Sequence, residues 1–202
     1  MKTWMKVVLG IVIAVLIIGF GTYRFFKNNY NAFVSLDEKM KMSWAQVQNQ
    51  YQRRSDLVPN LVETVKGYAA HERETLEEVT RARSQMGGVV NVTGDVVNNP
   101  EMMQKFQQAQ AGLGSALQRL MVVLEKYPDL KANQNFLELQ AQLEGTENRI
   151  SVERMRYNQA VMEYNQAIRK FPANLISGML KFQRAVPFEA APAAQEAPKV
   201  KF

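Results

Sequence analysis

Residues 100–127 read PEMMQKFQQAQAGLGSALQRLMVVLEKY, and their apolar side chains recur every three or four positions. The recurring residues are Met103, Phe106, Leu113, Leu117, Leu120, Leu124 and Tyr127. A single polar residue, Gln110, interrupts them. This spacing puts one apolar stripe along a helix and does not match the alternation of a half-buried strand. The stretch therefore predicts an amphipathic helix that must bury one face against partners.

Three further stretches show the same spacing. They contain Phe33, Leu36, Met40, Trp44, Val47 and Tyr51 in the first, Leu61, Val65, Ala69, Leu76 and Val79 in the second, and Phe136, Leu143, Ile150, Tyr157, Tyr164 and Ile168 in the last. Short turns between helices of similar length favour antiparallel neighbours. We therefore predict an all-α protein whose soluble part is an elongated antiparallel up-down-up-down four-helix bundle.

Turn-forming residues set the expected helix boundaries. The segment 53–60, with Asp56 ahead of Pro59, predicts a turn between the first two helices. Asn98 or Asn99, followed by Pro100, predicts the start of the third helix. The segment 127–133 predicts the next turn. In an antiparallel bundle the turns at 53–60 and 127–133 would lie together at the tip farthest from the N-terminus.

The N-terminal segment from Val7 to Tyr23 carries no charge and predicts a single-pass transmembrane helix that acts as a signal-anchor. Trp4 and Tyr23 would lie at the two membrane interfaces, with Lys6 reaching outward to water. A cleaved signal peptide is the alternative. The expected organisation is an anchor at 1–27, the bundle at 28–188 and a disordered Ala/Pro-rich tail at 189–202.

Composition excludes several classes of function. The formal net charge is +6, but four basic residues flank the anchor and leave the remainder close to neutral, so no nucleic-acid partner is expected. The chain has no cysteine and one histidine, His71, which excludes thiol catalysis and thiolate metal sites. Hydrolytic triads need a base, and His71 is the sole histidine that could serve as one. No glutamate stands three residues before His71, so the Glu-x-x-His pair of di-iron bundles is missing. We expect no catalytic residue, no cofactor and no metal.

Two surfaces are candidates for contacts with other molecules. The tip turns would offer Arg53, Arg54, Asp56, Asn60, Tyr127 and Asp129 to a protein partner, although Asp56 and an arginine could instead cap the helix ends. The segment 174–188 would offer Leu175, Met179, Lys181 and Phe182 to the membrane interface, or would fold back over the end of the bundle.

The first hypothesis for function is a non-enzymatic interaction or scaffold protein of the bacterial cytoplasmic membrane, with its bundle on the extracytoplasmic side. Its expected partners are the lipid bilayer and an unidentified protein, and homo-oligomerisation is left open. An enzyme or enzyme subunit that uses Asp56, Asn60 and the segment 144–148 at the bundle end is one alternative. A membrane-shaping protein that uses the segment 174–188 is the other.

Several longer stretches resemble the LemA family of bacterial membrane-anchored proteins. They are WAQV at 44–47, RRSDLVPNLVETVKGYA at 53–69, YPDLKAN at 127–133 and LEGTENRI at 143–150. The resemblance runs from the anchor to about residue 188. It implies a single-pass anchor with an elongated helical bundle, and it favours a role in envelope organisation or stress. It supplies no catalytic residue and no cofactor.

Overall fold

The computed structural model describes residues 3–90 and 96–189, and the regular secondary structure in these residues is helical throughout. The helices are α1 (Thr3–Lys66), α2 (Arg73–Val90), α3 (Pro100–Leu124), α4 (Pro128–Lys131), α5 (Gln134–Arg169) and α6 (Ala173–Met179). The all-α prediction is therefore confirmed. The tail predicted to be disordered lies, apart from residue 189, outside the described residues.

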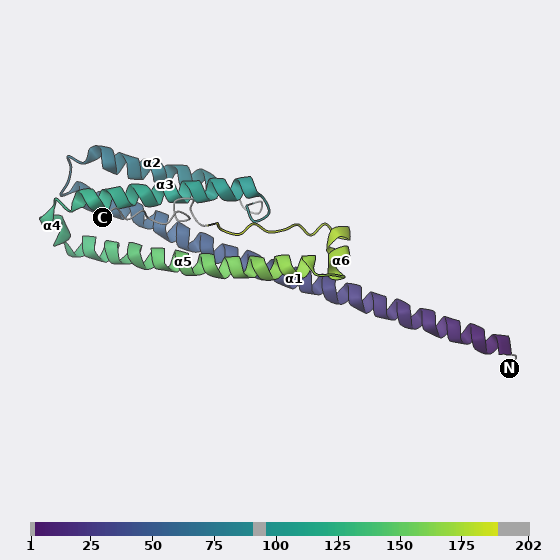
Figure 1. Cartoon of the computed structure of the whole chain (residues 1–202). Coiled ribbons are helices and arrows are strands. Elements are labelled where there is room, and N and C mark those ends of the chain that lie inside the picture. The colour runs from purple at the N-terminus through teal and green to yellow at the C-terminus, as the bar shows by residue number, and fades with distance from the viewer. Residues whose placement is uncertain (1–2, 91–95, 190–202) are drawn as a thin grey trace, which may run out of the picture.

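The four long helices form an elongated antiparallel bundle, as predicted. α1 runs alongside α5, and α2 runs alongside α3 (Figure 1). The chain passes up along α1, down α2, up α3 and down α5, while the first part of α1 projects beyond the bundle (Figure 1). We call the end from which α1 projects the basal end, and the opposite end the distal tip.

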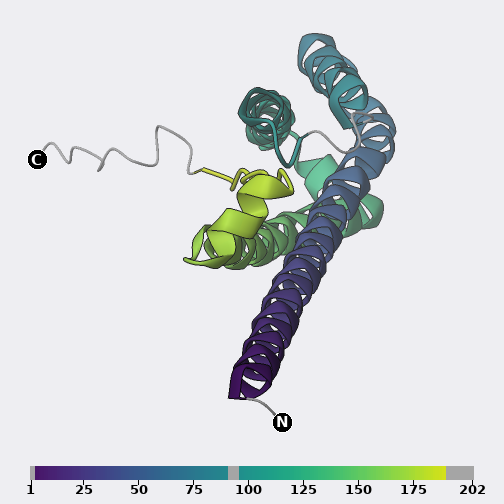
Figure 2. The ribbon, with the colours of Figure 1, turned by 90° about the vertical axis from the view of Figure 1, so that its right-hand side faces the viewer.

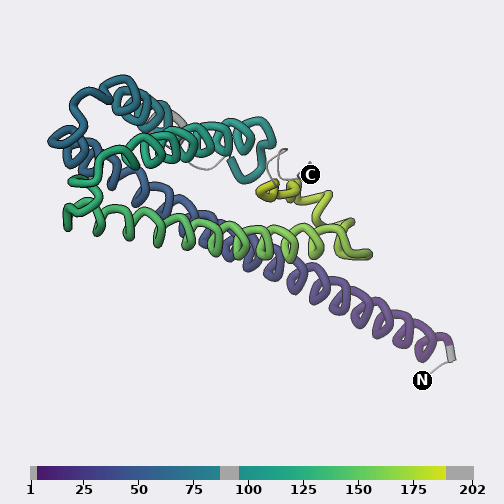
Figure 3. Tube along the Cα trace, turned by 60° about the vertical axis from the view of Figure 1, so that its left-hand side comes forward, coloured from purple at the N-terminus to yellow at the C-terminus, as the bar shows by residue number. Residues whose placement is uncertain are grey.

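The first turn predicted from the sequence is wrong. α1 is one helix of 64 residues that passes through Pro59 without interruption, and Figure 3 shows it as a single coil from the N-terminus to the distal tip. The chain turns at residues 67–72 instead, immediately after Gly67, a residue type that commonly ends helices. Arg53, Arg54, Asp56 and Asn60 therefore lie within a helix and not in a turn.

Pro59 is tolerated because a neighbouring helix replaces the hydrogen bond that proline removes. Pro59 has no backbone N–H, so the carbonyl of Ser55 loses its helical donor. Arg83 of α2 donates from Nε to that carbonyl oxygen at 3.0 Å. Val58 and Leu61, on either side of Pro59, are fully buried, so continuing the helix also continues the apolar stripe.

The long α1 leaves a short α2, and this divides the bundle into two halves. α2 has 18 residues and α5 has 36, which correspond to roughly 27 and 54 Å at about 1.5 Å per residue. In the distal half, four helices surround the core. In the basal half the fourth side is covered by residues 182–189, an extended segment that we call the strap (Figure 1).

The boundaries predicted before Pro100 and at 127–133 agree with the structure. The Asn99 side chain accepts hydrogen bonds from the backbone N–H groups of Glu101 and Met102 at the start of α3. Asn133, the last residue of the segment predicted as a turn, accepts from the N–H of Phe136 at the start of α5. α5 ends at Arg169, just before Phe171 and Pro172.

Two hydrogen bonds tie together the turns of the distal tip, which comprises residues 67–72 and 125–133. The Tyr127 hydroxyl donates to the Glu72 carboxylate at 2.9 Å, and the Asn133 amide donates to the Tyr68 hydroxyl at 2.9 Å. The bond to Glu72 raises the pKa of Tyr127 above its usual value. One turn of the tip thus matches the prediction, and the other, at 67–72, lies 12 to 14 residues later in the chain than the expected turn at 53–60.

The N-terminal part of α1 carries its apolar side chains on all sides without contacts to the bundle. Within the described residues, it is the one helix that is long and apolar enough to cross a membrane. Trp4, Leu16 and Tyr23 are all exposed by more than half of their surface. α1 therefore joins a candidate membrane span and the bundle core in one continuous rod.

Candidate functional site

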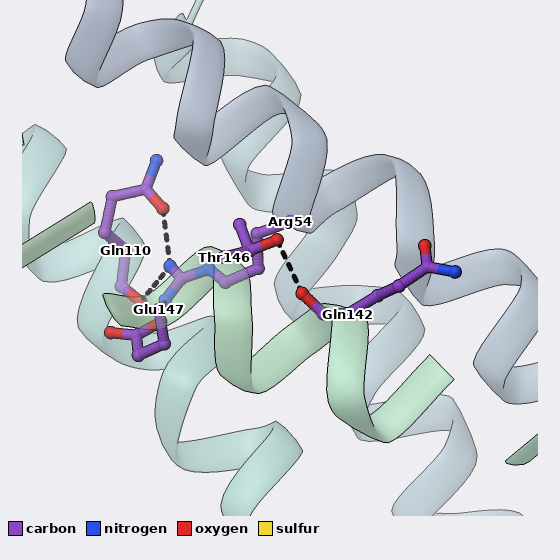
Figure 4. Close-up of polar contacts among 5 residues, drawn as sticks. All are labelled: Arg54, Gln110, Gln142, Thr146 and Glu147. Atoms are coloured by element: carbon purple, nitrogen blue, oxygen red, sulfur yellow. Dashed lines mark hydrogen bonds and ion pairs between the residues drawn. The ribbon is translucent and has the colours of Figure 1, made fainter. Parts of the chain in front are cut away.

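A polar layer crosses the middle of the bundle and is centred on Arg54, which is 4% exposed. Its Nη1 donates to the carboxylate of Glu147 on α5 at 2.9 Å. Its Nη2 donates to the side-chain oxygen of Gln110 on α3 at 2.7 Å and to the Gln110 carbonyl at 3.1 Å. Figure 4 shows this convergence of α1, α3 and α5. The guanidinium therefore links three helices at one level.

The polar layer separates two apolar clusters. On the basal side the next buried residues are Tyr51, Phe106 and Ile150. On the distal side they are Val58, Leu113 and Leu143. The Arg54 guanidinium lies 5.1 Å from the centre of the Tyr51 ring, and burial raises the pKa of Tyr51. Thr146, also buried, donates to the Gln142 carbonyl at 2.7 Å (Figure 4).

The chemistry of the layer is that of a structural link. The Glu147 side chain is 58% exposed, so the carboxylate keeps its contact with water while the arginine is removed from it. Guanidinium and amide groups are donors and acceptors, not nucleophiles or general bases at neutral pH. A buried polar layer of this kind penalises any sliding of one helix past another, because a shifted helix would leave the arginine without acceptors.

The strap is held by side chains that line one face of α5. Asn165 donates to the Ala185 carbonyl at 2.8 Å and accepts from the Ala185 N–H at 2.9 Å. Asn158 makes the same pair of bonds with the backbone of Phe188, at 3.0 and 2.8 Å. Tyr157 donates to the Val186 carbonyl at 2.8 Å. Each of the two amides thus bonds both the backbone N–H and the backbone C=O of one strap residue, as a neighbouring strand does in a sheet.

Phe188 anchors the strap in the apolar cluster on the basal side of the polar layer. Its ring lies 5.7 Å from Trp44, 6.4 Å from Phe106 and 5.5 Å from Tyr157, measured between ring centres. The guanidinium of Arg154 covers the ring at 4.6 Å. Burial in this aromatic cluster raises the pKa of Tyr157 far above its usual value. The strap could not be predicted from the sequence, although the Tyr-Asn pairs at 157–158 and 164–165, seven residues apart, indicate a shared helix face.

The residues predicted to bind a partner fall into two separate places. Arg53, Asp56 and Asn60 are exposed and line a shallow groove on the outer face of α1, where Asp56 accepts from Gln52 at 2.7 Å. Tyr127 and Asp129 lie at the distal tip, roughly 20 Å farther along, at about 1.5 Å per residue from Arg53 to the end of α1. Arg54 points into the bundle and is not available to a partner.

The residues predicted for the membrane interface also divide. Trp4, Lys6 and Tyr23 are exposed on the projecting part of α1, and Leu175, Met179 and Lys181 are exposed on and after α6. Phe182 instead packs on α1, with its ring 5.3 Å from Phe33 and 6.2 Å from Tyr30. Ile176, Ala185 and Phe188 are buried, so the segment 174–188 folds back on the bundle while part of α6 stays open.

The groups named for the enzyme alternative do not converge. Glu147 pairs with Arg54, and Glu144 accepts from Gln140 at 3.0 Å on the surface of α5. Asp56 and Asn60 face solvent from α1. In the parts of the chain that the structure describes, no three histidine or acidic side chains come together as a metal would require.

Comparison with known proteins gives a consistent picture. The model of the LemA family matches residues 43–202. Magnetosome protein MamQ 2 of Paramagnetospirillum magneticum is 28% identical over 183 residues, which cover 81% of this chain and 66% of the relative. Magnetosome protein MamQ of Magnetospirillum gryphiswaldense is 27% identical with the same coverage. Protein LemA of Metamycoplasma hominis is 24% identical over 145 residues, 72% of this chain and 62% of the relative.

The chain therefore spans about two thirds of the length of the curated relatives it matches. The family match begins within the bundle part of α1 and includes the polar layer, the distal tip, α6 and the strap. The match covers well over half of the sequence and agrees with the stretches that the sequence alone singles out. This protein belongs to the LemA family.

Proposed function

We propose that this protein is a non-enzymatic interaction protein of the bacterial cytoplasmic membrane that holds a docking surface, its distal tip, at a fixed height above the bilayer. The observation that carries the proposal is the continuity of α1. From Arg24, at the end of the apolar run, to Lys66 at the tip, the helix rises roughly 60 Å at about 1.5 Å per residue. A rod of this length keeps the tip away from the membrane surface.

The hydrogen bonds of the buried and half-buried polar side chains support a structural role for the interior of the bundle. Arg54 binds other helices, and the amides of Asn158 and Asn165 bind the strap. These interactions hold the helices and the strap together. The tip offers exposed groups for recognition: Tyr68 is exposed over 45% of its surface, and Asp129 is also exposed to solvent.

The test is site-specific photo-crosslinking in living cells, with a benzophenone amino acid in place of Asp129 at the tip. The matched control places the same amino acid at Asp56, which is also an exposed aspartate but lies on the side of α1. We expect a discrete adduct from position 129, a second one from Tyr68, and none from position 56. An adduct from position 56 alone would move the docking surface to the groove on α1, and no adduct at any position would contradict docking.

We further propose that the bundle is extracytoplasmic. The chain has no native cysteine, so Asp129→Cys provides a single reactive thiol at the tip. A membrane-impermeant maleimide is expected to label it in intact cells. Labelling that requires permeabilised cells would reverse the assignment of sides.

A further inference from the structure

The basal end of the bundle carries an apolar surface that the fold leaves open. α6 lies across this end, beside the projecting part of α1 (Figure 2). One face of α6 is buried through Ala173, Ile176 and Ser177, and the Ser177 hydroxyl donates to the Ile168 carbonyl at 2.6 Å. The opposite face and its flanks expose four large apolar residues, which we call the basal face: Phe171, Leu175, Met179 and Leu180.

The exposure of the basal face is high for apolar side chains of this size. Phe171 is 82% exposed and Met179 is 71% exposed. A contiguous apolar patch on a folded domain marks a contact with another apolar phase or with a partner. The buried residues of α6 meet the bundle, and α6 lies across the end from which α1 projects (Figure 2). We therefore infer that the basal face is turned away from the bundle, toward the side of the membrane span.

Position along α1 puts this face at the height of the bilayer surface. Phe182, directly after α6, packs on Tyr30 and Phe33. Tyr30 lies six residues beyond Arg24, or about 9 Å at 1.5 Å per residue. The headgroup layer and the burial depth of interfacial helices are each on the order of 5–10 Å. A side chain that points from α6 toward the span therefore reaches the headgroup layer.

Charge favours the same contact. Segments 24–36 and 164–188, which include α6 and the adjoining part of α1, contain basic residues and no acidic residue, while the start of α3 at the same end of the bundle carries Glu101. The basic residues are Arg24, Lys27, Arg169, Lys170, Lys181 and Arg184. Elsewhere in the described chain, basic and acidic residues are interspersed, often as ion pairs such as Lys39 with Glu163. A basic collar around an apolar face is the composition of an interfacial helix that binds anionic lipid.

We propose that the basal face is a second membrane contact, which inserts its apolar side chains among the headgroups of an anionic bilayer. The inference rests on the membrane anchoring in the proposed function and deepens it. A single spanning helix can rotate and tilt, whereas a helix and a basal face together define a fixed orientation. The contact would thereby set where the distal tip points as well as how high it stands.

The test uses the full chain, reconstituted at a low protein-to-lipid ratio into vesicles of phosphatidylcholine and phosphatidylglycerol that contain a nitroxide-labelled lipid. Because the chain has no cysteine, Met179→Cys provides one site for an environment-sensitive fluorophore. Met155→Cys on the side of α5 is the matched control, since Met155 has a similar exposure of 65%. Leu16→Cys within the span reports that the anchor is inserted.

We expect the fluorophore at position 179 to be quenched several-fold more strongly than at 155, and less strongly than at 16. Replacing the phosphatidylglycerol by phosphatidylcholine, or combining Lys170→Gln with Lys181→Gln, is expected to reduce the quenching at 179.

Equal quenching at 179 and 155 would overturn the contact. A shift of the emission to shorter wavelength without lipid quenching would also overturn it, because a protein surface would then cover the face. Quenching that does not depend on the anionic lipid would overturn the role of the basic collar. Strong quenching at position 16 in these cases leaves the proposed function standing.

Discussion

Replacing Phe188 by alanine is expected to lower the free energy of unfolding by about 3–5 kcal/mol, the usual cost of removing a fully buried aromatic ring. Phe188 is 6% exposed and contacts rings from α1, α3 and α5. Its removal leaves a cavity at the place where α2 is too short to complete the bundle. The strap would also lose the side chain that anchors it, so the amide pairs with Asn158 and Asn165 would weaken together with the packing.

Urea denaturation in detergent micelles, followed by far-ultraviolet circular dichroism, measures this effect. Phe171→Ala is the matched control, because the same ring is removed from a side chain that is 82% exposed. The control is expected to change the free energy of unfolding by no more than about 0.5 kcal/mol. If Phe188→Ala were as mild as Phe171→Ala, the strap would not be part of the core.

Replacing Arg54 by alanine is expected to lower the free energy of unfolding by about 2–4 kcal/mol. The change leaves a cavity and removes the donor that binds the buried oxygens of Gln110. Glu147 adds less to the cost, since its carboxylate is more than half exposed and is hydrated once the arginine is gone. Arg53→Ala, one residue earlier on the exposed face, is the control and is expected to change the free energy of unfolding by no more than about 0.5 kcal/mol.

A double variant separates the roles of charge and packing in the polar layer. Arg54→Met with Gln110→Leu replaces the two buried polar side chains by apolar ones of similar length. Such replacements are often neutral or stabilising, so most of the lost stability should return. A double variant as unstable as Arg54→Ala would show that the ion pair itself, and not the satisfaction of buried groups, stabilises this level of the bundle.

The same arginine explains why the helix boundary could not be predicted from the sequence. The buried positions of α1 run through Trp44, Val47, Tyr51, Arg54, Val58, Leu61 and Val65, a regular three-four spacing. A charged residue at one of these positions looks like the end of a stripe, and Pro59 strengthens that interpretation. Gln110 interrupts the stripe of α3 in the same way, and the two interruptions belong to one layer. Only the pairing of helices reveals that they match.

Other features were within reach of the sequence because they depend on local chemistry. The Asn99–Pro100 start, the Asn133 cap and the four apolar stripes need only short-range rules. The strap was not within reach. Its extended conformation follows from a gap that appears only once α2 proves shorter than the other long helices, and its binding residues lie about 20 to 30 positions away along the chain.

The same distinction between local chemistry and helix packing applies to the candidate surfaces. Tyr127 and Asp129 were placed at the tip because proline and aspartate mark a turn locally. Arg53, Asp56 and Asn60 were misplaced because the sequence does not show that Arg83 supplies the hydrogen bond that Pro59 removes. The fold-back of residues 174–188 and the open face of α6 are both real features, and the sequence presented them as alternatives.

The continuity of α1 is the claim on which the height and orientation of the tip depend, and an electron-spin distance measurement tests it most directly. Nitroxide labels at Gln46→Cys and Lys66→Cys, both exposed, lie 20 residues apart on α1. A continuous helix predicts a distance between the labelled backbone positions of about 30 Å in the full chain in lipid. A distance near 10 Å, the usual spacing of two packed helices, would mean that the chain turns back near Pro59 and would contradict the rod.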